Sequence, residues 1–592
     1  VLRVVAGSDI IGTTIDAQGD LLIGANTSSA AAGTAAVTLG DMTSLLAFSE
    51  LVCEDLIVGD ANGGQGSLSL RSGVLRCASA RFVGGHSALT IEQGVIDCSG
   101  PFIWENGPLT IDGIDSAGLL FQGVTTLDFP IRFGVARDGH IGVAGPSADV
   151  TVNGDITLGE QSTGHGDIDV SSRGTLTVAG TVHLGVAGNS SLATQSGGMF
   201  VADSLVVAAT SGSEAAISIG SNSAVGTLDA LYLGGTSLGP GGTADVSISN
   251  GVLSAQDVVV CWGGTTIDVN SGQIVSNANI SMRAGSSVTM SSSTLRATGL
   301  NFAGALNAVG DGVDLTGSGE VEAAITGTGT GNDITATGPL SLGLPSSVNG
   351  YSGTNIDLSV GPHTVTLGDA NNADIGNTTI AGGTLLTVQS INIPPGKTVS
   401  GGGTIDARFI LNAGNINATT PQGFVLKGIV SGTGPLTGTL FDFSNTGGFS
   451  GRDTLNSQIR GSAGSVITAT GNLTLGTATS TGFSFDGTII TNTNQVTLRD
   501  TSIAAVGNVQ LGGGSLFCTD TDLASDLNDV ASGFGTIVTT PRTWINAGTI
   551  RPDGLGAPVI GQISTLGNVN MENVFDTAVI DLDIGGTSNA TM

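Results

Sequence analysis

Aspartate and asparagine gather with glycine in three short stretches, and these residues are the best suited in the sequence to holding a metal ion. The stretches are GDANGG at 59–64, GDGVD at 310–314 and DANNAD at 369–374. Oxygen ligands of this kind suit Ca²⁺. None repeats the aspartate spacing of an EF-hand or of the nonapeptide Ca²⁺ repeat, so ordinary turn chemistry is the simpler interpretation. The candidate Ca²⁺ ligands are Asp60, Asp311, Asp314, Asp369 and Asp374.

Patterns associated with catalysis occur without the context that they need. GTSLG at 235–239 matches the nucleophile motif GxSxG, but that motif joins a strand to a helix, and no helical pattern follows here. GTGTGND at 327–333 lacks the Lys-Ser/Thr pair and the helix of a phosphate-binding loop. We therefore predict no catalytic residue, no enzymatic activity and no cofactor apart from the candidate Ca²⁺ ions. The histidines show no HExxH motif and no metal-ligand spacing: His86, His140, His165, His183 and His363.

The composition excludes several classes of protein. Among 592 residues, 48 are acidic and 17 basic, a net charge of −31, and only Lys397 and Lys427 are lysines. No basic stripe can meet phosphates, so nucleic acid is not an expected partner. No apolar run is long enough to cross a membrane as a helix, so a spanning helix is not expected. No signal peptide is visible at Val1, which suggests a mature or truncated product. The acidic surface keeps the chain soluble and could also gather divalent cations.

Short apolar bursts separated by glycine, serine and asparagine indicate β-strands. In GDIDVSSRGTLTVAG, Ile168 and Val170 point one way, and Asp167 and Asp169 point the other. AVIDLDIGG at the end of the chain alternates in the same way, with Asp581 and Asp583 outward. The acids of these strands are therefore expected on a solvated outer face.

The bursts recur with a period of roughly 20–28 residues, which indicates a solenoid. Leu158, Leu184, Val207 and Leu233 occupy equivalent places, and two further series extend the pattern. About three short strands fit in each period, fewer than a propeller blade requires. The sequence thus predicts an all-β protein, a parallel β-helix with about three strands per coil and the shape of an elongated rod. The further series are Cys261 and Met282, and Val58, Val83 and Ile103.

Three of the five cysteines share the same register. Cys77 in GVLRCAS and Cys98 in GVIDCSG follow the same GV pair, and Cys53 precedes Cys77 by one period. Stacked one rung apart, they would form a buried column. Both a disulfide between rungs and a ladder of free thiols are compatible with the sequence.

The C-terminal half contains a longer duplication. TGPLSLG at 337–343 matches TGNLTLG at 470–476, and LNAGNI at 411–416 matches INAGTI at 545–550. We expect three regions: a short-repeat solenoid at 1–335, a first long unit at 336–465, and a second at 466–592.

The repeats resemble those of autotransporter passengers and of extracellular bacterial proteins sorted by the PEP-CTERM system. The resemblance rests on LIVGDANGGQGSLSLRSGVLRCASARFVGG and on LYLGGTSLGPGGTADVSISNGVLSAQDVVVCWGG. The stretch 545–586 is similar to the closing module of those proteins, although Pro-Asp-Gly replaces the usual Pro-Gly. The resemblance implies an exported, surface-associated β-solenoid, secreted or at the cell surface.

Three functions are compatible with these observations. The first is a structural rod in a bacterial surface layer, filament or adhesin, which associates with itself head-to-tail or laterally, or with cell-surface glycans. The second is a carbohydrate-active β-helix enzyme, a polysaccharide lyase or hydrolase, which would cluster acids with basic residues on neighbouring coils. The third is a glycan- or host-binding adhesin. Three tryptophans could stack on sugars, although core packing explains them more simply: Trp104, Trp262 and Trp544.

Overall fold

The computed structural model describes two compact units, Val1–Ala323 with Thr328–Asn332 and Ala324–Gly327 with Asp333–Met592. Within them, the described residues are 2–4, 8–10, 14–24, 34–39, 49–61, 63–113, 117–303, 313–443, 447–479, 482–501, 503–518, 521–526, 528–546, 549–552, 563–571 and 579–580. None of these residues is helical, so no described helix could cross a membrane.

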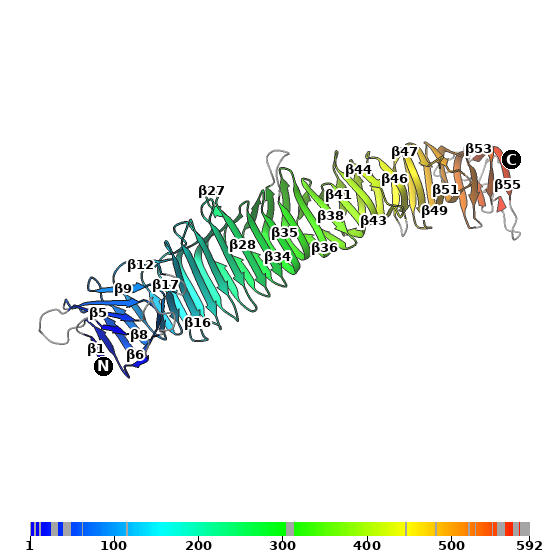
Figure 1. Cartoon of the computed structure of the whole chain (residues 1–592). Helices are drawn as coiled ribbons and strands as arrows, with labels where there is room; N and C mark the ends of the chain where they lie inside the picture. Colours follow the sequence, from blue (N-terminus) through cyan, green and yellow to red (C-terminus); the bar gives the residue numbers. More distant parts are fainter. Residues whose placement is uncertain are drawn as a thin grey trace. The chain divides into compact units, whose positions relative to one another are not determined.

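Each unit is a parallel β-solenoid, and the described part of the chain makes about 21 turns. Figure 1 shows the strands stacked turn upon turn within each unit. The predicted all-β, parallel β-helical fold is therefore confirmed. An antiparallel pair, β26 (Gly235–Thr236) with β27 (Gly239–Pro240), protrudes from this pattern in the first unit.

Three strands per turn are clearest between residues 138 and 303, where each turn contributes one strand to each of three faces. The first face stacks β16 (Asp138–Ala144), β19 (His165–Ser171), β21 (Asn189–Thr194), β23 (Glu214–Ile219), β28 (Thr243–Ser249) and β31 (Thr265–Asn270). The second stacks β17 (Asp149–Val152), β20 (Thr175–Leu184), β22 (Met199–Val207), β24 (Ala224–Thr227), β29 (Val252–Ala255) and β32 (Gln273–Ser276). The third stacks β18 (Ile156–Leu158), the later parts of β20 and β22, β25 (Leu231–Leu233), β30 (Val259–Cys261) and β33 (Asn279–Arg283). All three end in β34 (Ser287–Ala303).

The core consists of columns of aliphatic side chains, one from each turn. On the first face the members of the column are register partners on successive strands, and all are buried: Ile168, Leu192, Ile217, Val246, Ile267 and Val288. On the third face Leu184, Val207, Leu233, Cys261 and Met282 follow one another as the spacing predicts. Alternation of apolar and small polar residues thus gives each strand one buried face.

One predicted series is wrong by a single residue. The partner of Val58 on the next turn is Phe82, not Val83, and the partner of Phe82 is Trp104, not Ile103. Ile103 faces outward and is 45% exposed. Val83 follows the end of β8 (Gly73–Phe82) and is itself buried, so matching the two valines by type shifts the register by one residue.

Glycines allow the chain to turn where neighbouring coils approach closely. Gly134 follows β15 (Ile131–Phe133) with φ +54°, and a Cβ there would lie 1.9 Å from the carbonyl oxygen of His165 on the next turn. Only glycine fits this corner without displacing the neighbouring backbone.

The cysteine column is confirmed. Cys53 in β6 (Glu50–Val58) is the register partner of Cys77 in β8, and Cys77 is the partner of Cys98 in β10 (Gly94–Cys98). All three side chains are buried and all are free thiols.

The second unit repeats a pairing pattern along its length. β36 (Asn332–Gly343) pairs with β39 (Thr364–Gly368), so that Leu340 meets Val365. Equivalent residues of the duplicated stretch pair in the same way, Leu473 of β48 (Val466–Gly476) with Val496 of β50 (Gln495–Arg499). This is the relationship expected of a duplication, and the expected boundaries near 335 and 465 stay predictions.

Candidate functional site

The candidate Ca²⁺ ligands occupy turns and strand ends. Asp60 closes a turn, its amide donating to the Gly64 carbonyl at 2.9 Å. Asp314 begins β35 (Asp314–Thr328) and is exposed, and Asp311 lies outside the described residues.

The DANNAD stretch shows what its two aspartates do. Asp369 is 3% exposed, and its two oxygens accept from the backbone amides of Asn371 at 2.7 Å and Tyr351 at 3.2 Å. Asp374 in β40 (Asn372–Ile375) accepts a hydrogen bond at 2.7 Å from the side-chain amide nitrogen, Nδ2, of Asn392. The Asp369 carboxylate therefore stabilises a turn through backbone amides, and the Asp374 carboxylate is bonded to its register partner on the next turn. In the described parts of the chain, no three His, Cys, Asp or Glu residues are placed to hold a metal ion together. Ca²⁺ binding by the aspartates of these turns stays a prediction.

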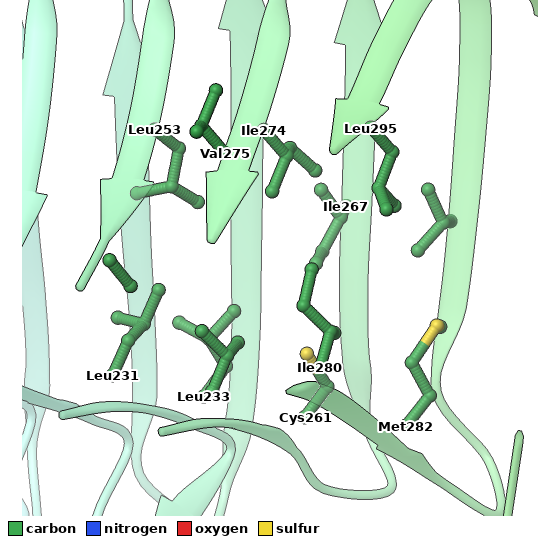
Figure 2. Close-up of a pocket in the computed structure, with 13 residues that line it drawn as sticks. Leu231, Leu233, Leu253, Cys261, Ile267, Ile274, Val275, Ile280, Met282 and Leu295 are labelled. Atoms are coloured by element: carbon green, nitrogen blue, oxygen red, sulfur yellow. The ribbon is translucent and has the colours of Figure 1, made fainter. Parts of the chain in front are cut away.

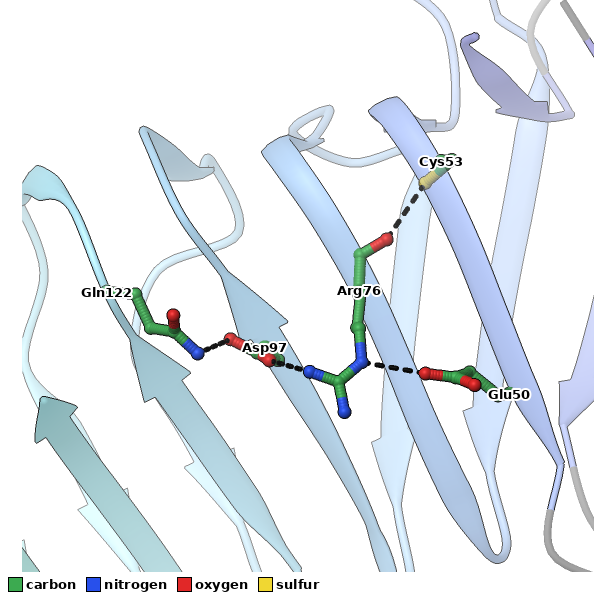
Figure 3. Close-up of polar contacts among 5 residues, drawn as sticks. All are labelled: Glu50, Cys53, Arg76, Asp97 and Gln122. Carbon is green, nitrogen blue, oxygen red and sulfur yellow. Dashed lines mark hydrogen bonds and ion pairs between the residues drawn. The ribbon is translucent and has the colours of Figure 1, made fainter. Parts of the chain in front are cut away.

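Charged side chains on the outer face form clamps between neighbouring turns, as Figure 3 shows for the turns around Arg76. Arg76 donates from Nε to Glu50 on the preceding turn and from Nη1 to Asp97 on the following turn, each at 2.7 Å. Gln122 on the turn after that donates to the other oxygen of Asp97 at 2.9 Å. The arrangement joins four successive turns.

Burial raises the pKa of Asp97, whose side chain is 8% exposed, and the charge of Arg76 opposes that rise. Glu105 is the contrasting case, because the backbone amide of Gly84 and the Arg81 guanidinium lower its pKa. Pairs of the same kind occur further along the first unit, Arg132 with Glu160 and Arg296 with Glu322. The arginines in these ion pairs hold neighbouring turns together.

A second polar cluster was not predicted from the sequence. His140 is the register partner of Asp167, and the Nε2 atom of His165 lies 3.2 Å from Oδ2 of Asp167. Ser191, on the next turn, donates to Oδ1 of Asp167 at 2.5 Å. Burial lowers the pKa of His140, against the opposing charges of Asp167 and Asp169. The sequence alone does not bring a histidine and an acid together here, because a full turn of the chain separates His140 from Asp167, and only the register places them side by side.

The cluster does not have the connectivity of a nucleophilic relay. A relay passes the serine proton to a histidine, whereas the Ser191 hydroxyl bonds directly to the carboxylate of Asp167. The arrangement holds one carboxylate between partners on neighbouring turns.

The GTSLG stretch forms the antiparallel hairpin β26–β27. Ser237 and Leu238 are its turn residues, and Leu238 is 96% exposed. A nucleophile elbow requires a strand followed directly by a helix. The match to GxSxG is therefore a feature of a short hairpin.

Two of the tryptophans have structural partners. Trp262 donates from Nε1 to the carbonyl of Thr236 at 2.9 Å, which ties the hairpin to the solenoid, and Arg283 lies over its ring at 5.4 Å. The ring centroid of Trp104 lies 5.3 Å from that of Phe82, and its Nε1 donates a hydrogen bond to the Gly107 carbonyl. Both rings thus have a packing role, and the side chain of Trp544 lies outside the described residues.

The described residues form a small cavity in the first unit and a groove in the second. Figure 2 shows a cavity of about 20 Å³ inside the first unit, which is lined entirely by apolar side chains such as Leu253, Cys261 and Met282. It is far below the ~300 Å³ of a ligand pocket. A groove of about 470 Å³ in the second unit is lined by glycine, alanine, threonine, glutamine and valine. No titratable side chain lines that groove.

No protein-family model matches the chain, and no curated protein matches its sequence.

Proposed function

We propose that the chain is an extracellular structural β-solenoid, a component of a bacterial surface layer, filament or adhesin. The observation that supports this proposal is the unbroken register of buried columns, such as Ile168 to Val288, over consecutive turns. Each strand finds hydrogen-bond partners on the turns before and after it. The repeats that resemble autotransporter passengers and PEP-CTERM-sorted proteins point to the same class.

The proposed mechanism is geometric. Stacked parallel turns provide length, and the cross-turn clamps around Arg76 add side-chain bonds to the backbone ladder. An extended structure of this kind spans distance at a surface and resists proteases, because its backbone amides are already paired.

The charge of the chain suggests how copies associate. Acidic residues outnumber basic ones by 48 to 17, and several arginines are engaged in pairs within the chain. Neighbouring copies would repel one another laterally unless cations screen them. We therefore propose that Ca²⁺ promotes self-association, head-to-tail or side by side, and that cell-surface glycans are the other class of partner.

Sedimentation of the purified chain, in Ca²⁺ and in chelator, tests this function together with electron microscopy of the same samples. We expect larger assemblies in Ca²⁺ with a regular repeat. A monodisperse monomer at high concentration in both conditions would contradict self-association. Release of reducing ends or unsaturated sugars from a polysaccharide would instead support the enzymatic alternative.

A further inference from the structure

The groove in the second unit is formed by three successive turns, at β41 (Thr378–Leu386), β43 (Thr398–Asn412) and the start of β45 (Phe424–Ser431). Its volume of about 470 Å³ falls within the ~300–1,000 Å³ of ligand pockets. The structural role proposed above does not use it. An equivalent corner occurs a second time further along this unit, and the difference between the two shows what the groove has room for.

The two corners correspond in sequence and in strand pairing. GGGTI in the first corner matches GFGTI in the second, so Phe534 is the equivalent of Gly402. Gly402 is the register partner of Ala381. Phe534 is the register partner of Gly512, the residue that matches Ala381 in the duplication. The register shifts directly after each pair, so both corners contain the same irregularity.

An aromatic ring fills the second corner and is missing from the first. A Cβ atom on Gly513 would lie 2.9 Å from a ring carbon of Phe534, so the ring lies directly against that glycine. Gly382 is the equivalent of Gly513, and nothing lies within 4 Å of its Cβ position. The first corner therefore has room for a six-membered ring that another molecule supplies.

Polar side chains without partners border the open corner. Thr404 precedes the buried Ile405 and so faces outward, and Thr420 and Gln422 belong to the turn before β45. The Thr420 hydroxyl lies over Gly402, where a Cβ atom would overlap it. Within the described part of the chain, no hydrogen bond engages the hydroxyls of these two threonines or the side-chain amide of Gln422. These groups are free to bind a ligand.

The lining favours a neutral ligand that carries hydroxyl groups. No titratable side chain lines the groove, although the net charge of the chain is −31. Further along the same strands, Lys427 Nζ lies 3.5 Å from Oδ2 of Asp406, so these two charges offset each other. An aromatic side chain would fill the space but displace water from the threonine hydroxyls without replacing its hydrogen bonds, which is unfavourable. A pyranose supplies both the ring and the hydroxyls.

We propose that this groove binds one pyranose ring of a neutral glycan. The ring lies against Gly382, where Phe534 lies in the second corner, and its hydroxyls bond to Thr404, Thr420 and Gln422. The inference rests on the proposed function in one respect, because it takes cell-surface glycans as a partner and assigns the site that binds them.

Saturation-transfer NMR of the full chain with neutral methyl glycosides tests the proposal. The probes are the methyl α-D-pyranosides of glucose, mannose and galactose, and we expect at least one of them to bind. The double variant Thr404→Val/Thr420→Val keeps the shape of the groove but removes two hydrogen bonds, and it should weaken binding by about tenfold. Gly402→Phe installs the ring of the second corner and should abolish binding.

Thr536→Val is the matched control, because Thr536 is the equivalent of Thr404 in the corner that Phe534 fills, and it should bind as the wild type does. Circular dichroism should show the same strand content in each variant, and the double valine variant decides the result if Gly402→Phe does not fold. The proposal is overturned if the wild type binds none of the three glycosides, or if the folded double variant binds them as tightly as the wild type.

Two further probes test the class of ligand. Equally strong binding of methyl α-D-glucopyranosiduronate, an ionised sugar, would contradict the assignment to a neutral glycan. Binding of N-acetylphenylalaninamide that the double valine variant leaves unchanged, and that no glycoside displaces, would assign the groove to an aromatic side chain instead. Sedimentation measures self-association separately, so a chain that assembles in Ca²⁺ but binds no glycoside contradicts this inference and leaves the structural function standing.

Discussion

Arg76 and Asp97 lie on neighbouring turns, and Nη1 of the arginine donates to Oδ2 of the aspartate at 2.7 Å. The aspartate side chain is 8% exposed, whereas that of the arginine is 50% exposed. A nearly buried carboxylate is thus neutralised by a guanidinium that reaches it from the surface. Its second oxygen is held by Gln122 from the opposite side. The pair should contribute more to stability than the exposed pairs elsewhere on this unit.

Replacing Arg76 tests this difference. Arg76→Met keeps the aliphatic stem but leaves the Asp97 charge without its cation, and we expect a loss of about 1–3 kcal/mol in the free energy of unfolding. Arg296→Met is the matched control, because Arg296 and Glu322 are both exposed, and its loss should stay below about 1 kcal/mol. Urea unfolding of both variants measures the comparison, and equal losses would contradict it.

The pH dependence of Arg76→Met has a definite sign. The pKa of Asp97 is already raised by burial, and removing the guanidinium should raise it further. A carboxyl group with a raised pKa in the folded state destabilises that state when it is ionised. The cost of the substitution should therefore be smallest below the pKa of Asp97 in the wild-type fold and grow as pH rises from that value toward the higher pKa in the variant, because the unfolded-state pKa is the same for both chains. A cost that is independent of pH would indicate lost packing.

The apolar columns predict a sharp difference between two adjacent residues. Ile217 of β23 is buried between Leu192 and Val246, whereas Ser218 faces outward. Ile217→Ala should lower the free energy of unfolding by about 2–5 kcal/mol, because it opens a cavity in a packed column. Ser218→Ala should change it by less than about 0.5 kcal/mol. Urea unfolding followed by far-UV circular dichroism measures both, and similar effects would contradict the assigned register.

The sequence is sufficient to predict the strands and the direction of their side chains, because alternation and period follow directly from burial on one face. Ile168 and Val170 are inside, with Asp167 and Asp169 outward, as the pattern requires. The series Val58, Val83 and Ile103 shows where the sequence is not sufficient to predict the register. Val58 and Val83 match in type, but where strands end in corners of different length, only hydrogen-bonded pairing determines the register.

Contacts between side chains on different turns could not be predicted for a related reason. His140 and Asp167, or Arg76 and Glu50, become neighbours only when the length of each turn is known to the residue. The turns differ in length along the first face, since the turn that ends at Val246 is longer than the one that follows it, so an average period misplaces such partners. The cysteines were exceptional because the same GV pair precedes Cys77 and Cys98.

A substitution at Asp369 tests whether this aspartate has a structural role or binds a metal ion. Its carboxylate accepts from the amides of Tyr351 and Asn371, so Asp369→Ala should cost about 1–3 kcal/mol whether or not Ca²⁺ is present. Asp374→Ala, which removes a single contact with Asn392, should cost less. Thermal unfolding of both variants in Ca²⁺ and in chelator measures this. A loss for Asp369→Ala that appears only with Ca²⁺ would show that the carboxylate binds the ion.

His140 should make the first unit sensitive to mild acid. Burial lowers its pKa in the folded state, so the unfolded chain binds a proton more readily. Stability is therefore fully present above the ordinary His pKa of about 6.5 and is lost as pH falls from that value toward the lowered pKa. His140→Gln should remove part of this loss, and adding His183→Gln, whose imidazole has a pKa lowered by burial as well, should remove more. Urea midpoints between about pH 7.5 and pH 5 measure the slope. If the slope of the double variant equals that of the wild type, other groups account for the acid sensitivity.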